Sequence, residues 1–316
     1  MMFTCQELQI EPTNRCNLHC SICSHSLLGV SKEKDLTFSE FKAILDKFGN
    51  RLERVFLQGL GEPFLNPELN AMISYACQQG LFVYTTTNAN AFTERIIQGM
   101  ISSGLNELRI SIDTFDATLY ENIKSGGKLE RVVEAVKLIN RKKKESGVSS
   151  PVLRINTVVM KETMPGLMRI IDMAAFLDVV EVSLIPLVIH GRGMAIEEHN
   201  VSALPDGVLK KLVLQAKQQA GKHGIELVSG ISTERHPDAI GIEQYFSPRC
   251  YRSMYIQSNG DLAPCCNLPL RFGNIFEEEL TDIIKSEKMN MLRYFIQKNK
   301  PPCHDCVNFA YNCLNL

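Results

Sequence analysis

Apolar and polar positions along this chain follow two periods in turn, which predicts strands and helices that alternate. Short, mostly apolar runs predict buried strands, and longer segments with apolar positions three and four residues apart predict amphipathic helices. The expected strands cover residues 7–12, 54–58, 81–86, 107–112, 152–159, 179–185 and 226–228. The expected helices cover residues 38–48, 67–79, 93–102, 128–144, 164–176 and 205–222. This alternation indicates βαβ units around a parallel sheet, with the functional site at the C-terminal ends of the strands.

The last part of the chain follows a different pattern. Two short strand-like runs flank Asn259-Gly260, and an Asn-Gly pair in this position is a strong signal for a β-hairpin. A helical pattern follows over residues 277–297. We therefore expect an α/β domain over residues 1–230 and a small hairpin and helix domain over residues 231–316.

Composition and charge exclude several classes of protein. The 316 residues are 45% hydrophobic, which suffices for a large core. With 34 basic and 35 acidic residues, no overall field attracts nucleic acid, and no apolar run is long enough to span a membrane. Eleven cysteines in a long chain without a signal-peptide pattern indicate metal binding in a reducing, cytoplasmic environment.

Three cysteines near the N-terminus, Cys16, Cys20 and Cys23, directly follow the first expected strand. Their spacing lets one loop fold three thiolates around a single inorganic centre. Thiolates suit iron–sulfur chemistry, and three ligands for a four-iron cube leave one iron open to a group that is not protein. A structural zinc site with His19 or His25 as fourth ligand is the alternative that these residues leave open.

The Cys-x3-Cys-x2-Cys run resembles the defining motif of the radical S-adenosylmethionine (SAM) enzymes, although Ile22 stands where an aromatic residue is usual. The resemblance implies a partial (β/α)6 barrel over residues 1–230 and a [4Fe-4S] cluster on the three cysteines. In this family the amino and carboxylate groups of SAM chelate the open iron, and an electron from the cluster cleaves SAM to give a 5′-deoxyadenosyl radical. That radical abstracts hydrogen from an unactivated C–H bond, which no side chain does alone.

Further motifs similar to those of the family lie at the ends of the next three expected strands, and Asn156 lies on the strand expected after them. The residues that the resemblance implies as SAM contacts are Gly59, Gly61, Glu62, Asn88, Ser111, Lys124 and Asn156. Glycine allows close approach of the backbone, and Glu62 can accept a hydrogen bond from the SAM ammonium group. Ala89 stands where the family usually has glycine. Lys124 stands where relatives often have arginine, so a point charge replaces a bidentate fork.

A second group of cysteines lies near the C-terminus. The expected hairpin brings Cys250 and Cys265 towards each other, and Cys303-x2-Cys306 follows. This order resembles the SPASM or twitch extension of radical SAM enzymes, and it implies one auxiliary [4Fe-4S] cluster held by these four thiolates. Other cysteines can exchange places with these ligands, namely Cys266 and Cys313. A four-cysteine zinc ribbon is the alternative.

An auxiliary cluster accepts electrons, so the resemblance implies oxidation of a sugar-like or aminocyclitol-like small molecule, or of a peptide. Two other outcomes stay open, which are epimerisation with Cys266 or Cys313 as hydrogen donor and crosslinking of a peptide. Because few residues precede the first strand, we expect no fused peptide-binding module. Arg192, in the loop after the strand expected at 179–185, is the candidate catalytic residue for contact with the substrate.

The resemblance also implies an electron donor of the flavodoxin or ferredoxin type. The alternative outside enzymology is a regulator that binds an iron–sulfur cluster or zinc. Such regulators usually pair their cysteines with a basic nucleic-acid surface, and the net charge of −1 indicates none.

Overall fold

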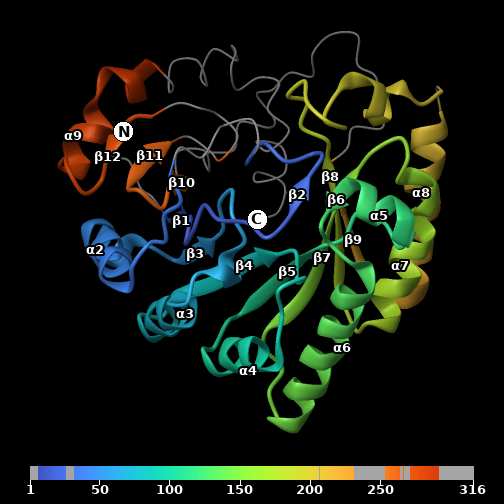
Figure 1. Ribbon diagram of the computed structural model, residues 1–316, viewed down its shortest axis with the longest axis horizontal. Helices are drawn as coiled ribbons and strands as arrows, with labels where there is room; N and C mark the ends of the chain where they lie inside the picture. The colour runs from blue at the N-terminus through green and yellow to red at the C-terminus, as the bar shows by residue number, and fades with distance from the viewer. Residues whose placement is uncertain are drawn as a thin grey trace. The chain divides into compact units, whose positions relative to one another are not determined.

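The computed structural model describes residues 6–25, 32–205, 207–230, 253–263, 266 and 271–291 (Figure 1). The chain forms two compact units. The first comprises residues 1–16, 28–85 and 236–316, and the second comprises residues 17–27 and 86–235.

The first unit contains a sheet in the order β12-β11-β10-β1-β3-β4. Its strands are β1 (Glu7–Ile10), β3 (Arg54–Leu57), β4 (Phe82–Thr87, whose last residues belong to the second unit), β10 (Ser253–Ile256), β11 (Asp261–Ala263) and β12 (Gly273–Asn274). Strand β1 pairs in parallel with β3 and with β10, and β3 pairs in parallel with β4. Strands β10, β11 and β12 pair antiparallel, so the C-terminal hairpin continues the sheet beside the strand that precedes the cysteines.

The second unit contains parallel strands in the order β5-β7-β8-β9. These strands are β5 (Glu107–Ser111), β7 (Val152–Val159), β8 (Glu181–Pro186) and β9 (Glu226–Ser229). A separate two-stranded ladder pairs β2 (His19–Cys20) with β6 (Lys124–Ser125). Ion pairs lie near the N-terminal ends of these parallel strands, where Arg154 pairs with Glu107 and Glu181, and Arg109 pairs with Glu107. The functional site is expected at the opposite, C-terminal ends of the strands.

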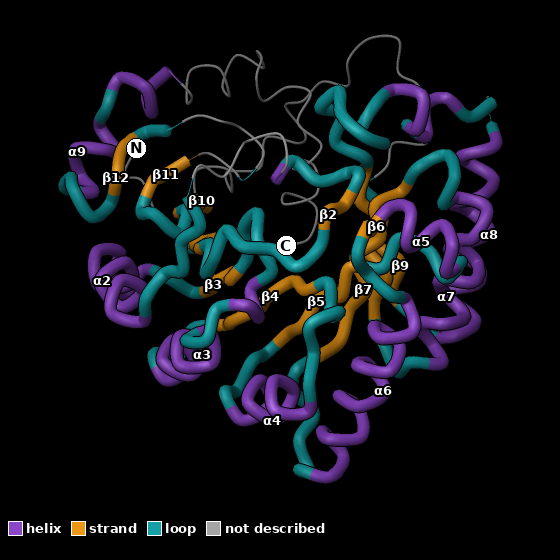
Figure 2. Tube along the Cα trace, in the orientation of Figure 1, coloured by secondary structure: helices purple, strands orange, loops and turns teal. Residues whose placement is uncertain are grey.

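Helices connect the strands within each unit (Figure 2). The first unit has α2 (Phe38–Phe48), α3 (Leu69–Gln78) and α9 (Leu280–Lys285). The second has α4 (Glu94–Ser102), α5 (Ala117–Ile123), α6 (Leu129–Glu145), α7 (Leu167–Phe176) and α8 (Val208–His223). Short 3-10 turns lie at Gly49–Arg51, Pro63–Leu65, Met164–Gly166, Glu197–His199 and Val201–Ala203. Helices α7 and α8 pack side by side against β8 and β9 (Figure 1).

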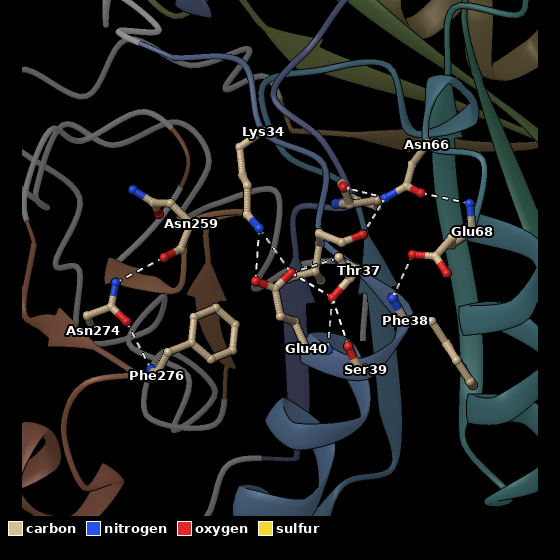
Figure 3. A network of polar contacts seen from close by, with 12 residues as sticks. Lys34, Thr37, Phe38, Ser39, Glu40, Asn66, Glu68, Asn259, Asn274 and Phe276 are labelled. Atoms are coloured by element: carbon tan, nitrogen blue, oxygen red, sulfur yellow. Dashed lines mark hydrogen bonds and ion pairs between the residues drawn. The ribbon is translucent and has the colours of Figure 1, made fainter.

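Local chemistry explains where α2 begins. Thr37 and Glu40 form a capping box, in which the Glu40 N–H donates to Thr37 Oγ1 at 3.2 Å and the Thr37 N–H donates to Glu40 Oε2 at 2.7 Å (Figure 3). The ammonium group of Lys34 pairs with the same Glu40 carboxylate at 2.8 Å. Glu68 accepts from the Phe38 N–H at 3.0 Å, so the loop before α3 also fixes the start of α2.

The parallel α/β fold expected from the sequence is confirmed, and each expected strand of the α/β region has a counterpart. The hairpin around Asn259-Gly260 is confirmed as β10 and β11. The single helix expected at 277–297 is wrong, because α9 spans Leu280–Lys285, Ser286 interrupts it, and helical residues resume at 287–291. The expected domain boundary at residues 230 and 231 stays a prediction.

Among the helices that the structure describes, none is both long enough and apolar enough to cross a lipid bilayer.

Candidate functional site

In the first unit, the segment of residues 11–16 leads from β1 to the first cysteine and is held by side chains from later loops. The Asn66 amide donates to the carbonyl oxygens of Pro12 at 2.6 Å and Leu36 at 2.8 Å. Arg15 forms a bidentate pair with Asp35, with Nε at 3.0 Å and Nη2 at 2.6 Å from its oxygens. Such pairs fix geometry as well as adding energy, so Cys16 follows a constrained segment.

The loop that carries Gly59, Gly61 and Glu62 packs on this same segment. A β-carbon at Gly61 would lie 2.3 Å from the Thr13 carbonyl oxygen and 2.5 Å from that of Arg15. The Glu62 N–H donates to the Arg15 carbonyl oxygen at 2.8 Å. Contact between these two loops therefore requires glycine at position 61.

The carboxylate of Glu62 is buried, and it accepts from the Phe64 N–H at 3.3 Å, which caps the 3-10 turn Pro63–Leu65. At Gly59 a β-carbon would lie 2.2 Å from a carboxylate oxygen of Glu11. The roles of Gly59, Gly61 and Glu62 as SAM contacts stay predictions, and loop packing is the role that the sequence analysis missed.

We expect Gly61→Ala to destabilise the protein strongly, because its methyl group meets backbone oxygens that cannot rotate away. A clash of this kind costs about 1–3 kcal/mol of unfolding free energy or more. Gly221→Ala on α8 is the matched control, since nothing lies within 4 Å of its β-carbon. Alanine there should stabilise the helix by about 0.5–1 kcal/mol. Urea unfolding of both variants measures the difference, and equal effects would contradict the packing role.

In the second unit, the loop with Cys20 and Cys23 is held by its backbone. The β2–β6 ladder places Cys20 opposite Lys124. The Ser21 N–H donates to the Ile123 carbonyl oxygen at 2.8 Å, and the Met194 N–H donates to the Ser21 carbonyl oxygen at 2.9 Å. Segments after β5 and β8 therefore position the cysteine loop from two sides.

Gly193, at a φ of +55°, allows the closest approach to this loop. A β-carbon on Gly193 would lie 2.2 Å from the Ser21 carbonyl oxygen. Apolar side chains complete the contact, because Ile22 and Met194 pack against a cluster that includes Ile123. The cysteine loop and the loop after β8 thus form one packed structure.

Two groups near Cys23 stabilise a thiolate against the effect of burial. Burial raises the pKa of the Cys23 thiol, whereas the His25 N–H, which donates to Cys23 Sγ at 3.4 Å, and the charge of Lys124 oppose this shift. Hydrogen bonds to sulfur and a nearby cation stabilise metal-bound thiolates, so the donor set fits an iron–sulfur cluster. Within the described residues, no three His, Cys, Asp or Glu side chains gather around one point as a single metal ion requires. Each thiolate of a four-iron cube binds a different iron atom, so its ligands stand further apart.

Lys124 is buried with Asp113, and their charged atoms lie 3.0 Å apart at exposed fractions of 7% and 1%. Burial by itself lowers the pKa of Lys124, but the charges of Asp113 and the Cys20 thiolate raise it above its ordinary value. The other carboxylate oxygen of Asp113 accepts from the Val158 N–H at 2.8 Å. A positive charge is therefore fixed beside the cysteine loop, and its contact with SAM stays a prediction.

Asn88 braces the cysteine loop, because its amide donates to the side-chain oxygen of Asn17 at 2.9 Å. Ala89 has a φ of +55°, a conformation that favours glycine, so the backbone there matches the family motif although the residue differs. The buried hydroxyl oxygen of Thr86, at the end of β4, has no hydrogen-bond partner in the described structure. A polar group of a bound molecule would satisfy this oxygen.

Ser111, Asn156 and Ser183 are register neighbours on β5, β7 and β8. The structure thus brings two expected SAM contacts, Ser111 and Asn156, together in one row across the sheet, with Ser111 at the end of β5 and Asn156 within β7. Residues at paired positions of parallel strands point to the same face, so the row presents polar groups together.

The loop after β8 holds a residue that the sequence analysis did not single out. Both ring nitrogens of His190 are buried, and neither has a hydrogen-bond partner in the part of the chain that the structure describes. The His190 N–H donates to the Ala195 carbonyl oxygen at 3.0 Å, so the backbone of this loop is fixed. Arg192 lies exposed at the turn of the same loop. No sequence signal separates His190 from the other histidines, because only burial reveals its unpaired nitrogens.

The expected auxiliary ligands Cys250, Cys265, Cys303 and Cys306, together with Cys313, lie outside the described residues. Cys266 is described and is half-buried just beyond β11. These ligand assignments stay predictions.

A parallel α/β fold with a cysteine loop, glycine contacts and a buried charge is the arrangement that the resemblance to SAM-dependent iron–sulfur enzymes implies. Residues 10–174 match the radical SAM superfamily, and residues 249–307 match SPASM, an iron-sulfur cluster-binding domain. The chain belongs to the radical SAM superfamily.

Two relatives are similar over most of their length. The AdoMet-dependent heme synthase of Methanosarcina barkeri is 26% identical over 296 residues, which cover 86% of this chain and 80% of the relative. The probable GTP 3',8-cyclase of Methanocaldococcus jannaschii is 26% identical over 303 residues, covering 92% of this chain and 93% of the relative. Among solved structures, Streptococcus suis SuiB bound to S-adenosylmethionine superposes with a TM-score of 0.71 at 20% identity, covering 93% of this chain and 69% of SuiB.

The protein is thus an enzyme that uses SAM and [4Fe-4S] clusters, as the resemblance of its motifs implies. This finding replaces the alternative of a non-enzymatic regulator.

Proposed function

We propose that this enzyme oxidises a small molecule by removing hydrogen from an unactivated C–H bond. The observation that carries the proposal is the cysteine loop held beside the buried Lys124–Asp113 pair, in a chain that also has a SPASM domain. The names of its relatives support a small molecule, since one is a heme synthase and the other a probable GTP cyclase, and both are similar over most of this chain.

When bound, SAM and the clusters supply a hydrogen-abstracting radical and an electron acceptor. The side chains of the protein bind SAM and remove a proton from the substrate. Lys124 provides a fixed positive charge for the SAM carboxylate, and the polar row of Ser111 and Asn156 provides hydrogen bonds for its ribose or carboxylate. Oxidation of an alcohol or amine removes two electrons and two protons. The 5′-deoxyadenosyl radical would take one hydrogen atom, the auxiliary cluster would take one electron, and one proton needs a base.

We assign this base to His190. Its buried, unpaired ring nitrogens support the role, because a group from the substrate can satisfy them. The loop of His190 also contacts the cysteine loop through Met194. Histidine is the side chain that most often acts as a general base in enzymes.

The proposal extends to the partners and the cell compartment. A flavodoxin or ferredoxin would reduce the first cluster, since a reduced cluster is needed before SAM is cleaved. Such donors and the many thiolates suit the reducing cytoplasm. The auxiliary ligands proposed are Cys250, Cys265, Cys303 and Cys306, and the SPASM match at residues 249–307 contains all four.

The first test is anaerobic reconstitution with iron, sulfide, SAM and dithionite. We expect the reduced protein to form 5′-deoxyadenosine, measured by mass spectrometry. With its substrate, we expect a product two mass units lighter. No 5′-deoxyadenosine from the cluster-loaded protein would refute the proposal. A product with the same covalent connectivity as the substrate and one deuterium taken from deuterated water would favour an epimerase. A crosslinked peptide would favour a peptide maturase.

We expect His190→Gln to lower product formation by about 10²-fold, because the variant has no base for the final proton. SAM cleavage should continue, since His190 acts after hydrogen abstraction. His223→Gln is the control, because this exposed histidine pairs with Asp172 on the helical surface. Assays of both 5′-deoxyadenosine and product separate the two steps. Normal product formation by His190→Gln would remove His190 from the mechanism.

A further inference from the structure

Glu11, at the end of β1, is a buried carboxylate whose hydrogen bonds join two parts of the first unit. Its side chain accepts from the Leu60 N–H at 2.7 Å and from the Tyr255 hydroxyl at 2.7 Å. It also accepts from the Ser258 N–H at 3.2 Å and the Ser258 hydroxyl at 2.9 Å. Glu11 is only 2% exposed, so these bonds are shielded from water.

The carboxylate depends on these donors. In the part of the chain that the structure describes, no ion pair involves Glu11, so hydrogen bonds alone compensate its buried charge. Hydrogen bonds to a charged group are stronger than those between neutral groups. Loss of any one donor therefore weakens the whole arrangement.

The donors belong to two segments with different tasks. Leu60 lies between Gly59 and Gly61, in the loop that resembles a SAM-binding motif. Tyr255 and Ser258 belong to the β10–β11 hairpin, within the SPASM match at residues 249–307. Backbone contacts reinforce the junction, because the Glu11 N–H donates to the Ile256 carbonyl oxygen at 2.9 Å.

We propose that Glu11 is a positioning residue that couples the Gly59–Gly61 loop to the hairpin of the SPASM domain. Because one carboxylate receives donors from both segments, a displacement of the hairpin shifts the loop. The coupling does not depend on the identity of the substrate. It links the occupancy of the SAM site to the arrangement of the auxiliary-cluster domain.

The test changes the hairpin and measures the loop. Ser258→Ala removes a hydroxyl donor from Glu11, and Tyr255→Phe removes another. In hydrogen–deuterium exchange of the cluster-loaded protein, both variants should exchange faster in peptides that contain Leu60. SAM titrations followed by electron paramagnetic resonance of the reduced first cluster should show affinity weakened about threefold to tenfold.

Asn259→Ala is the matched control, because its side chain binds Asp261 within the same hairpin and does not touch Glu11. It should leave both the exchange at Leu60 and the SAM affinity unchanged. Glu11→Gln should reproduce the effects of the hairpin variants, because its amide places a donor against other donors. If Ser258→Ala and Tyr255→Phe alter exchange in the hairpin alone and bind SAM normally, the coupling is refuted. These readouts need no substrate, so they are independent of the proposed oxidation.

Discussion

Replacing any one of Cys16, Cys20 or Cys23 by serine is expected to abolish the formation of 5′-deoxyadenosine. A serine hydroxyl stays protonated near neutral pH and is a poor ligand for iron, whereas the iron–sulfur cluster requires thiolates. Hydrogen bonds hold the segment before Cys16 and the backbone at Ser21, so the serine variants should keep the path of the loop. Iron and sulfide analysis, together with mass spectrometry of the reaction with SAM and dithionite, measures the loss.

Cys77→Ser is the matched control for these variants. Cys77 lies half-buried on α3, outside the loop that carries the N-terminal triad. The variant should keep the iron content and the SAM cleavage of the unmodified enzyme. Substantial cleavage by a serine variant of the N-terminal triad would contradict the assignment of these ligands.

Lys124→Met is expected to destabilise the enzyme by about 3–5 kcal/mol of unfolding free energy, because it leaves Asp113 charged and buried without its partner. The loss should also disturb the cluster, since Lys124 lies opposite Cys20 in the β2–β6 ladder. Anaerobic urea unfolding of the cluster-loaded protein measures the stability, and absorbance measures the cluster.

Two further variants show whether the buried pair causes this effect. Lys128→Met removes an exposed ion pair with Glu121 and should cost at most about 1 kcal/mol. Adding Asp113→Asn to Lys124→Met should recover much of the stability, because no buried charge then lacks a partner. A loss of similar size in Lys124→Met and Lys128→Met would rule out a special role for burial.

The periodic pattern of the sequence predicted the elements that bury a regular face. Strands such as Val152–Val159 and helices such as Phe38–Phe48 lie where their apolar positions indicate. The ladder of His19–Cys20 with Lys124–Ser125 was missed, because two-residue strands show no period and their pairing depends on tertiary structure. Helix α5 was missed as well, since only seven residues form it.

The candidate site was predicted in part. Motifs at the strand ends placed Ser111 and Asn156, which the structure brings together. The sequence analysis linked Gly59 and Gly61 to SAM binding. The structure shows that these glycines pack closely on the segment of residues 11–16. The unpaired nitrogens of His190 and the four donors around Glu11 depend on contacts between residues far apart in sequence, which spacing cannot reveal.

The close contact between Gly193 and Ser21 limits how this enzyme can be re-engineered. Libraries that diversify the loop after β8 to change substrate preference also touch the support of the iron–sulfur centre. Gly193 and Met194 should therefore be kept constant. The neighbouring Arg192 is exposed, so its position can be randomised.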